Sequence, residues 1–195
     1  MGNKYIDSTL LDKAIIFAVK AHANTERRGK GFPYIVHPLE ALEIVATITP
    51  DQEIQAAAVL HDTVEDTDVT LEQLRAEFGD RVAKLVEEES DSNIPGFSDD
   101  MSWRERKQMA LDRLRGAEYD AKIVAMGDKL SNMRAMARDY RVLGDKLWER
   151  FHAPNGMADH SWRYHALADA FSELSETEAF KEFYKLVNEI FPQNK

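Results

Sequence analysis

The amino-acid sequence predicts an all-α protein, and three observations support this prediction. Apolar residues recur at helical spacing along most of the chain. Helix-start signals precede several of these segments, among them the capping-box pairs Thr70 with Gln73 and Ser102 with Glu105. No segment shows the apolar–polar alternation of a strand. We expect residues 1–195 to form a single domain, because a chain of this length can bury one sizeable core.

The N-terminal part is predicted to be a helix, a basic loop and a second helix. The first helix follows a cap at Asp7 or Ser8 and ends near Asn24. Residues 26–33 contain two glycines, one proline and three positively charged side chains, which is typical of an exposed loop. Pro38 is suited to begin the next helix and biases the histidine before it away from helical geometry.

The third predicted helix is capped by Asp51 and runs without a break to about Asp66. The capping box at Thr70 opens the fourth helix, which Gly79 ends. Residues 90–100 are rich in turn-forming residues and predict a loop.

The C-terminal half continues the helical pattern. Gly144 interrupts it, and Ser175 with Glu178 gives a third capping box before the last helix. The helices predicted after Asp51 span residues 52–66, 70–79, 80–89, 102–115, 119–139, 146–151 (a short helix or turn), 159–174 and 175–191.

The most informative motif is residues 58–67, in which His61 and Asp62 are followed by Glu65 and Asp66. Residues three and four apart share one face of a helix, so the three carboxylates can point into one cavity. Burying like charges together is unfavourable, and a divalent cation relieves that cost. The alternative is a solvated acidic helix end with a structural histidine.

Two further positions extend this candidate metal site. His37 lies at a helix entrance beside the basic loop, and Asp128 follows an apolar segment of a long predicted helix. Together with His61 and Asp62 they provide two imidazoles and two carboxylates, which suit a first-row divalent metal with open positions. Such a metal activates water and polarises phosphoryl oxygens, and nearby carboxylates can then orient or deprotonate the water.

Two cationic residues of the basic loop are candidates for contact with a phosphorylated substrate. Arg28 and Lys30 suit phosphoryl oxygens, and the alternative is a solvated basic turn. On the long predicted helix, Asn132 shares a face with Asp128, four residues before it.

Composition excludes several other classes of protein. There are no cysteines, so disulfides and thiolate metal sites are absent. No segment has the ~20 apolar residues of a membrane span, and the N-terminus has no apolar signal core, so we expect a cytoplasmic protein. The net charge of -10 disfavours nonspecific nucleic-acid binding. There is no glycine-rich phosphate loop or nucleophile elbow, which disfavours a kinase or serine hydrolase.

Three blocks of the sequence resemble the metal-dependent HD-domain phosphohydrolases, and in particular the hydrolase domain of the RelA/SpoT alarmone enzymes in its small stand-alone form. The blocks are residues 34–38, 61–67 and 127–134. The sequence departs from the family pattern in having glycine between Arg28 and Lys30, and in having Gly127 where alanine is usual.

The resemblance implies an HD-domain helical bundle that hydrolyses the 3′-pyrophosphate of ppGpp or pppGpp to give GDP or GTP and pyrophosphate. It implies manganese as the cofactor and Glu65 with Asp66 as the catalytic pair. It implies Arg28 in the basic loop and Asn132 near the nucleotide. It adds a phosphate contact as one interpretation of Lys129, beside that of a solvated or salt-bridged lysine. The metal ligands that it implies are His37, His61, Asp62 and Asp128.

Two other functions stay open on the sequence alone. One is an HD-domain phosphatase that acts on another nucleotide, such as NADPH or a nucleoside monophosphate. The other is a metal-binding sensor module without turnover, which the carboxylate pair Glu65 and Asp66 disfavours. Trp162 and Tyr164 are predicted to lie in the core or in a pocket wall. The sequence gives no oligomeric state.

Overall fold

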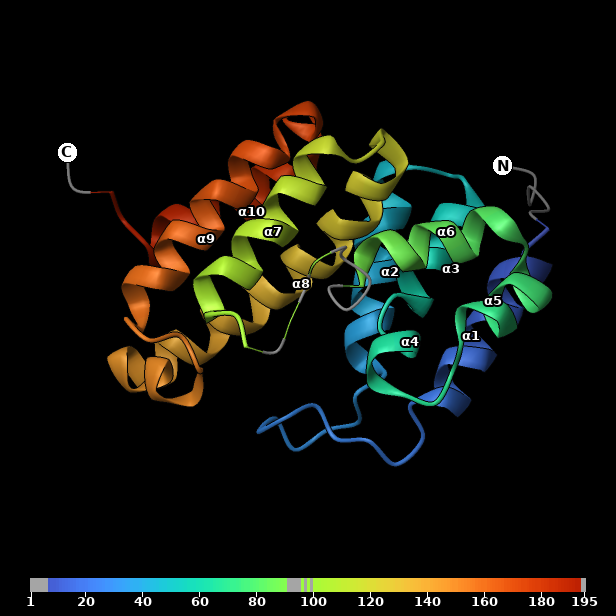
Figure 1. Ribbon diagram of the computed structural model, residues 1–195, viewed down its shortest axis with the longest axis horizontal. Coiled ribbons are helices and arrows are strands. Elements are labelled where there is room, and N and C mark those ends of the chain that lie inside the picture. The colour runs from blue at the N-terminus through green and yellow to red at the C-terminus, as the bar shows by residue number, and fades with distance from the viewer. Residues whose placement is uncertain (1–6, 91–95, 97, 99, 194–195) are drawn as a thin grey trace, which may run out of the picture.

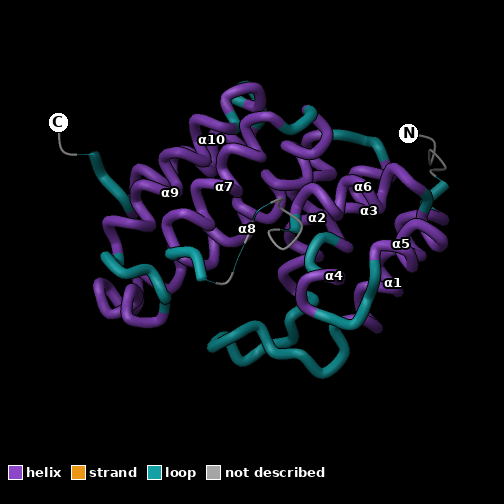
Figure 2. The backbone as a smooth tube through the Cα atoms, in the orientation of Figure 1, coloured by secondary structure: helices purple, strands orange, loops and turns teal. Residues whose placement is uncertain are grey.

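The computed structural model describes residues 7–90, 96, 98 and 100–193 and confirms the all-α prediction. The described residues form α-helices and short 3₁₀-helices, with one isolated bridge between Glu26 and Pro33. The segment that contains the basic loop (residues 26–33) lies at the lower edge of the molecule, blue in Figure 1 and teal in Figure 2. The helices are α1 (Thr9–Ala21), α2 (Val36–Ile48), α3 (Gln52–Leu60), α4 (Thr63–Asp66), α5 (Leu71–Phe78), α6 (Asp80–Glu89), α7 (Trp103–Gly116), α8 (Tyr119–Leu143), η2 (Gly144–Arg150), α9 (Met157–Ala170), η3 (Ser172–Leu174) and α10 (Glu178–Ile190).

The long helix α8 is the centre of the fold and packs against α2, α3, α6 and α10 (Figure 1), and α10 also contacts α2. Gly127 lies where α8 crosses α2. A β-carbon at Gly127 would be only 2.8 Å from the carbonyl oxygen of Ala41 and 2.8 Å from Cγ2 of Val45. The absence of a side chain therefore permits the close approach of the two helices, one residue before Asp128.

The continuous helix predicted over residues 52–66 is wrong, because α3 ends at Leu60 and α4 begins at Thr63. Side chains replace the helical backbone bonds at this break. His61 Nδ1 lies 2.8 Å from the carbonyl oxygen of Ala58, and Thr63 Oγ1 donates to the carbonyl oxygen of Leu60 at 2.7 Å. Such local side-chain bonds compete with the helix. His61 and Asp62 stand at this junction with backbone angles that stay in the right-handed helical region.

Two predicted helix starts also differ from the structure. His37 lies inside the first turn of α2 and not before it. Pro38 is compatible with this position, because first-turn N–H groups have no intrahelical partner. The last helix is capped by Thr177, whose side chain accepts from Phe180 N, and not by Ser175, which lies in the preceding turn.

The loop predicted over residues 90–100 lies mostly outside the described residues. Over the described ranges, none of the helices combines the length and the apolar character that crossing a membrane requires.

Candidate metal centre

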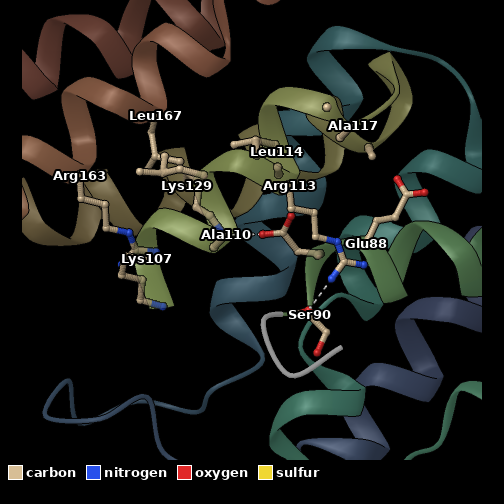
Figure 3. A pocket seen from close by; sticks show the side chains of 15 residues that line it. Glu88, Ser90, Lys107, Ala110, Arg113, Leu114, Ala117, Lys129, Arg163 and Leu167 are labelled. Atoms are coloured by element: carbon tan, nitrogen blue, oxygen red, sulfur yellow. Dashed lines mark hydrogen bonds and ion pairs between the residues drawn. The ribbon is translucent and has the colours of Figure 1, made fainter. Parts of the chain in front are cut away.

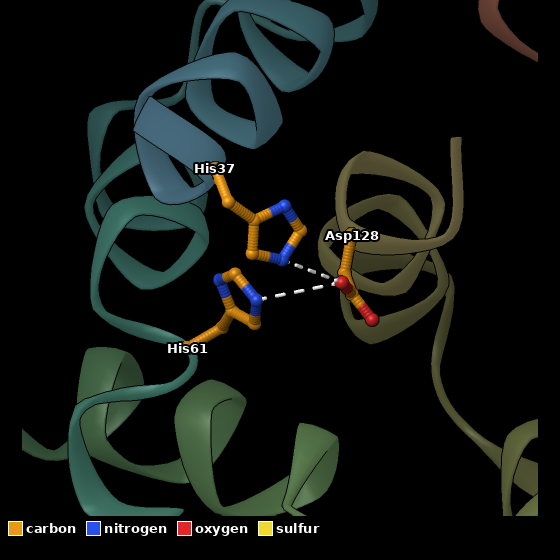
Figure 4. A group of neighbouring side chains, drawn as sticks. All are labelled: His37, His61 and Asp128. Carbon is orange, nitrogen blue, oxygen red and sulfur yellow. Dashed lines mark ion pairs between the residues drawn. The ribbon is translucent and has the colours of Figure 1, made fainter. Parts of the chain in front are cut away.

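Three elements bring His37, His61 and Asp128 together (Figure 4). His37 comes from the first turn of α2, His61 from the break after α3, and Asp128 from the middle of α8. One potential ligand atom of each lies within 4.8 Å of the others, and all three residues are buried. Asp128 Oδ1 is 3.0 Å from His37 Nε2 and 3.6 Å from His61 Nε2.

Asp62 completes the set predicted from the sequence. Its Oδ2 lies 2.9 Å from His61 Nε2 and 3.4 Å from His37 Nε2. The hydroxyl of Tyr34 donates to the same oxygen at 2.6 Å and so fixes the orientation of the carboxylate. Asp62 therefore lies beside both imidazoles, next to the closer group of His37, His61 and Asp128.

The donor set fits a divalent cation. The Nδ1 atom of His61 donates to a backbone carbonyl, because a carbonyl oxygen can only accept. In the neutral ring the other nitrogen, Nε2, then carries the lone pair, and this atom faces Asp62 and Asp128. This Nε2 is buried and makes no hydrogen bond with the described residues, although Asp62 Oδ2 is close. An imidazole lone pair directed at carboxylate oxygens is favourable only when a cation or a proton lies between them. Two imidazoles and two carboxylates suit a first-row divalent metal.

The electrostatics of the site agree with this assignment. Burial raises the pKa of Asp128, but the opposing effect of Lys129 and the two histidines is larger. The pKa of Asp128 is therefore held well below its usual range. Burial lowers the pKa of His61, but Asp62 and Asp128 outweigh this effect and raise it. The carboxylates thus stay ionised and attract positive charge.

Three of the four candidate ligands, His37, Asp62 and Asp128, line a polar cavity of about 250 Å³, here called the metal cavity, and His61 lies behind them. Glu65 and Asp66, the predicted catalytic pair, line it from α4. Its wall carries five carboxylates and three cationic side chains. The lining residues are Arg27, Tyr34, His37, Asp62, Glu65, Asp66, Glu89, Asp128, Lys129, Asn132 and Arg163.

Two of the four predicted substrate contacts lie at the metal cavity. Asn132 donates to Asp128 Oδ1 at 2.5 Å. Lys129 forms ion pairs with Asp128 and Glu89. Arg28 is exposed and does not line the cavity, and Lys30 is paired with Asp139 outside it.

The loop cation at the metal cavity is Arg27. Its guanidinium donates to Asn132 Oδ1 at 2.5 Å and lies 5.2 Å from the centroid of the Tyr34 ring. Sequence reasoning also missed Glu89 and Arg163. Arg27 belongs to the predicted basic loop, so a signal for it was present. Glu89 and Arg163 resemble solvated helix residues in the sequence, and only the tertiary fold brings them to the site.

A second cavity of about 300 Å³ adjoins the metal cavity and shares Glu89, Lys129 and Arg163 with it. Its floor is apolar, made of alanine and leucine side chains of α7, α8 and α9. Figure 3 shows Arg163 and Lys107 at one end and Arg113 with Glu88 at the other. We call it the adjoining cavity.

Trp162 and Tyr164 line neither cavity. Tyr164 is buried and stacks on Phe191, with ring centroids 5.7 Å apart. Trp162 is half-buried beneath the guanidinium of Arg104, 4.1 Å from the ring centroid. Both aromatic side chains therefore serve packing.

Comparison with known proteins identifies similar sequences. The HD domain profile matches residues 14–159. The guanosine-3′,5′-bis(diphosphate) 3′-pyrophosphohydrolase MESH1 of Danio rerio is 36% identical over 137 residues, which cover 67% of this chain and 71% of the relative. Its Homo sapiens counterpart is 37% identical, covering 68% and 72%.

Solved structures share the fold. A crystal structure of lmo0812 from Listeria monocytogenes has a TM-score of 0.69 at 28% identity, covering 80% of this chain and 99% of that one. The structure of a metazoan orthologue of SpoT, whose title states that it hydrolyses ppGpp, has a TM-score of 0.73 at 22% identity, covering 97% of both chains.

The donor set predicts that a divalent cation stabilises the folded protein. We expect Mn²⁺ or Zn²⁺ to stabilise protein that has been freed of metal by a chelator. At a free ion concentration about 100 times the dissociation constant of that ion, the free energy of unfolding should rise by roughly 2.7 kcal/mol. His61→Ala should lose most of this gain, because it removes a ligand. Thermal melts with and without cation measure the effect. His152→Ala, a change of an exposed histidine, is the control. Equal stabilisation of wild type and His61→Ala would contradict the site.

Proposed function

The chain belongs to the HD domain family and, within it, to the group of the MESH1 pyrophosphohydrolases, and we propose from this premise that it hydrolyses the 3′-pyrophosphate of ppGpp and pppGpp. The products are GDP or GTP and pyrophosphate. The observation that carries the proposal is the convergence of His37, His61, Asp62 and Asp128 at a cavity that also holds Glu65 and Asp66.

We assign the metal as Mn²⁺, held by those four converging side chains. Imidazole and carboxylate ligands with open positions are compatible with manganese. When bound, such an ion lowers the pKa of water and polarises a phosphoryl oxygen. Its positive charge also offsets the excess of carboxylates over cations in the metal cavity.

The two cavities together suit a nucleotide with a pyrophosphate group. The polar metal cavity can take the 3′-pyrophosphate, with Arg27, Lys129 and Arg163 as cations and Asn132 as a neutral hydrogen-bonding group. The adjoining cavity has an apolar floor suited to a base, and Lys107 and Arg113 at its ends suit further phosphates. Arg28 and Lys30 are not part of this assignment.

Glu65 and Asp66 are assigned to proton transfer. Both lie one turn beyond the ligand pair on α4 and face the metal cavity. One takes a proton from the water that attacks the phosphorus attached to the 3′ oxygen. The bond between that phosphorus and the 3′ oxygen then breaks. The 3′ oxygen retains the electron pair and takes up the proton that the carboxylate had accepted, which forms the hydroxyl of GDP or GTP, and the attacking oxygen leaves in pyrophosphate.

A substrate panel tests the proposed function. With Mn²⁺, the protein should release one pyrophosphate and one GDP per ppGpp, and a chelator should abolish turnover. Orthophosphate release from NADPH or from nucleoside monophosphates, without turnover of ppGpp, would instead support a phosphatase. No turnover of any nucleotide by the metal-loaded protein would support a sensor module.

Glu65→Gln and Asp66→Asn should keep the fold and the metal but lose turnover. These changes remove the proton acceptor and keep the shape of the side chain. A general base contributes about 10²–10⁴-fold, so we expect losses in kcat of that order in at least one variant. Metal content and melting temperature are measured in parallel. Near-normal turnover in both variants would remove the pair from the mechanism.

Arg27→Ala should lower kcat/KM for ppGpp while Arg28→Ala leaves it nearly unchanged. Only Arg27 lines the metal cavity, although the two arginines are adjacent in the same loop. Loss of one charge-assisted phosphate contact costs about 1.5–3 kcal/mol, or roughly tenfold or more in kcat/KM. Steady-state kinetics at equal metal content measures both variants. A larger loss in Arg28→Ala would show that the exposed arginine turns inward to the substrate.

A further inference from the structure

The side of His37 that faces away from the metal cavity meets a polar chain of side chains. His37 Nδ1 lies 2.8 Å from Ser131 Oγ, and both side chains are buried. Ser131 Oγ in turn donates to Glu40 Oε2 at 2.7 Å. Ser131 follows Asp128 by three residues on α8, and Glu40 follows His37 by three residues on α2. The chain therefore crosses the contact between these two helices.

This arrangement determines which nitrogen of His37 carries a proton. A hydroxyl has one hydrogen, and Ser131 gives it to the carboxylate of Glu40, which can only accept. The hydroxyl oxygen must therefore accept from His37, so that Nδ1 is protonated. The Nε2 lone pair is then directed at the space between Asp62 and Asp128, where a metal ligand needs it.

Arginines of α8 hold Glu40 in place from the other side. Arg134 lies 3.5 Å and Arg138 lies 3.7 Å from Glu40 Oε1. Arg134 is itself held by a two-pronged pair with Glu182 of α10, at 2.8 and 2.6 Å. Arg134 also lies 3.5 Å from Glu43, a mostly exposed residue, whereas Ser131 donates to Glu40.

We propose that Ser131 and Glu40 are positioning residues that hold His37 in its Nδ1–H form and direct Nε2 to the metal. The hydrogen-bonded carboxylate also makes the imidazole a stronger ligand. His61 is held instead by a backbone carbonyl at its Nδ1, so no carboxylate is linked to it from that side. The inference rests on His37 being a metal ligand, as the proposed function has it, and does not depend on which nucleotide is hydrolysed.

The first test measures Mn²⁺ binding alone, from the electron paramagnetic resonance signal of the free ion. Loss of a residue that supports a metal ligand typically weakens metal affinity by about 10–100-fold. We expect such a loss for Ser131→Ala and a similar or smaller one for Glu40→Gln. Glu43→Gln is the matched control, since it removes a carboxylate paired with the same arginine but leaves Ser131 untouched.

A second measurement separates positioning from general packing. In the Zn²⁺-loaded protein, the Nδ1–H proton of His37 should give a hydrogen-bonded, slowly exchanging NMR signal. That signal should be lost in Ser131→Ala, while the corresponding signal of His61 remains. Ser131→Thr, which keeps the hydroxyl, should restore both the signal and the affinity.

Three outcomes would overturn the inference. The first is wild-type Mn²⁺ affinity in both Ser131→Ala and Glu40→Gln. The second is an equal loss of Mn²⁺ affinity in Glu40→Gln and Glu43→Gln. The third is an unchanged NMR signal of His37 in Ser131→Ala. If Ser131→Ala does not fold, the comparison of Glu40→Gln with Glu43→Gln decides alone. None of these measurements involves ppGpp, so a failure of the substrate assignment would be seen separately, in the nucleotide panel.

Discussion

The carboxylates of Asp62 and Asp128 face two imidazoles at the metal cavity, and the mutual repulsion of these carboxylates is the constraint that the site has to satisfy. Such a group of side chains is stable only around positive charge. It also has to be assembled from α2, α8 and the segment after α3, so these elements must approach closely. Gly127 permits this approach, because any side chain there would collide with the backbone of α2. Packing and metal chemistry therefore constrain neighbouring residues of α8.

The break after Leu60 links local structure to chemistry. Side-chain bonds from His61 and Thr63 to carbonyl groups of α3 end the helix and turn the chain. His61 and Asp62 stand at this junction, and α4 then presents Glu65 and Asp66 to the metal cavity. The candidate ligand pair and the candidate catalytic pair therefore lie on either side of one helix end.

The all-α fold was predictable because helical periodicity and capping boxes are local signals. The meeting of His37, His61, Asp62 and Asp128 was predictable because the motifs are short and chemically unusual. The break between α3 and α4 was not predicted, because helix propensity does not report hydrogen bonds from side chains that compete with those of the helical backbone. The position of Arg27 at the metal cavity was not predicted, for a different reason. Arg27 and Arg28 are adjacent in a loop that contains glycines, and the contact of Arg27 with Asn132 is seen only in the structure.

A series of ion pairs and hydrogen bonds leads from His37 to α10, which lies outside the segment that the HD domain profile matches. That segment ends at residue 159, whereas α10 begins at Glu178. Glu182 of α10 holds Arg134, and Arg134 lies against Glu40, which accepts the hydrogen bond of Ser131. A C-terminal helix that contributes no lining residue to the metal cavity is therefore connected to a candidate ligand through side chains alone. The orientation of His37 is consequently a property of α2, α8 and α10 together.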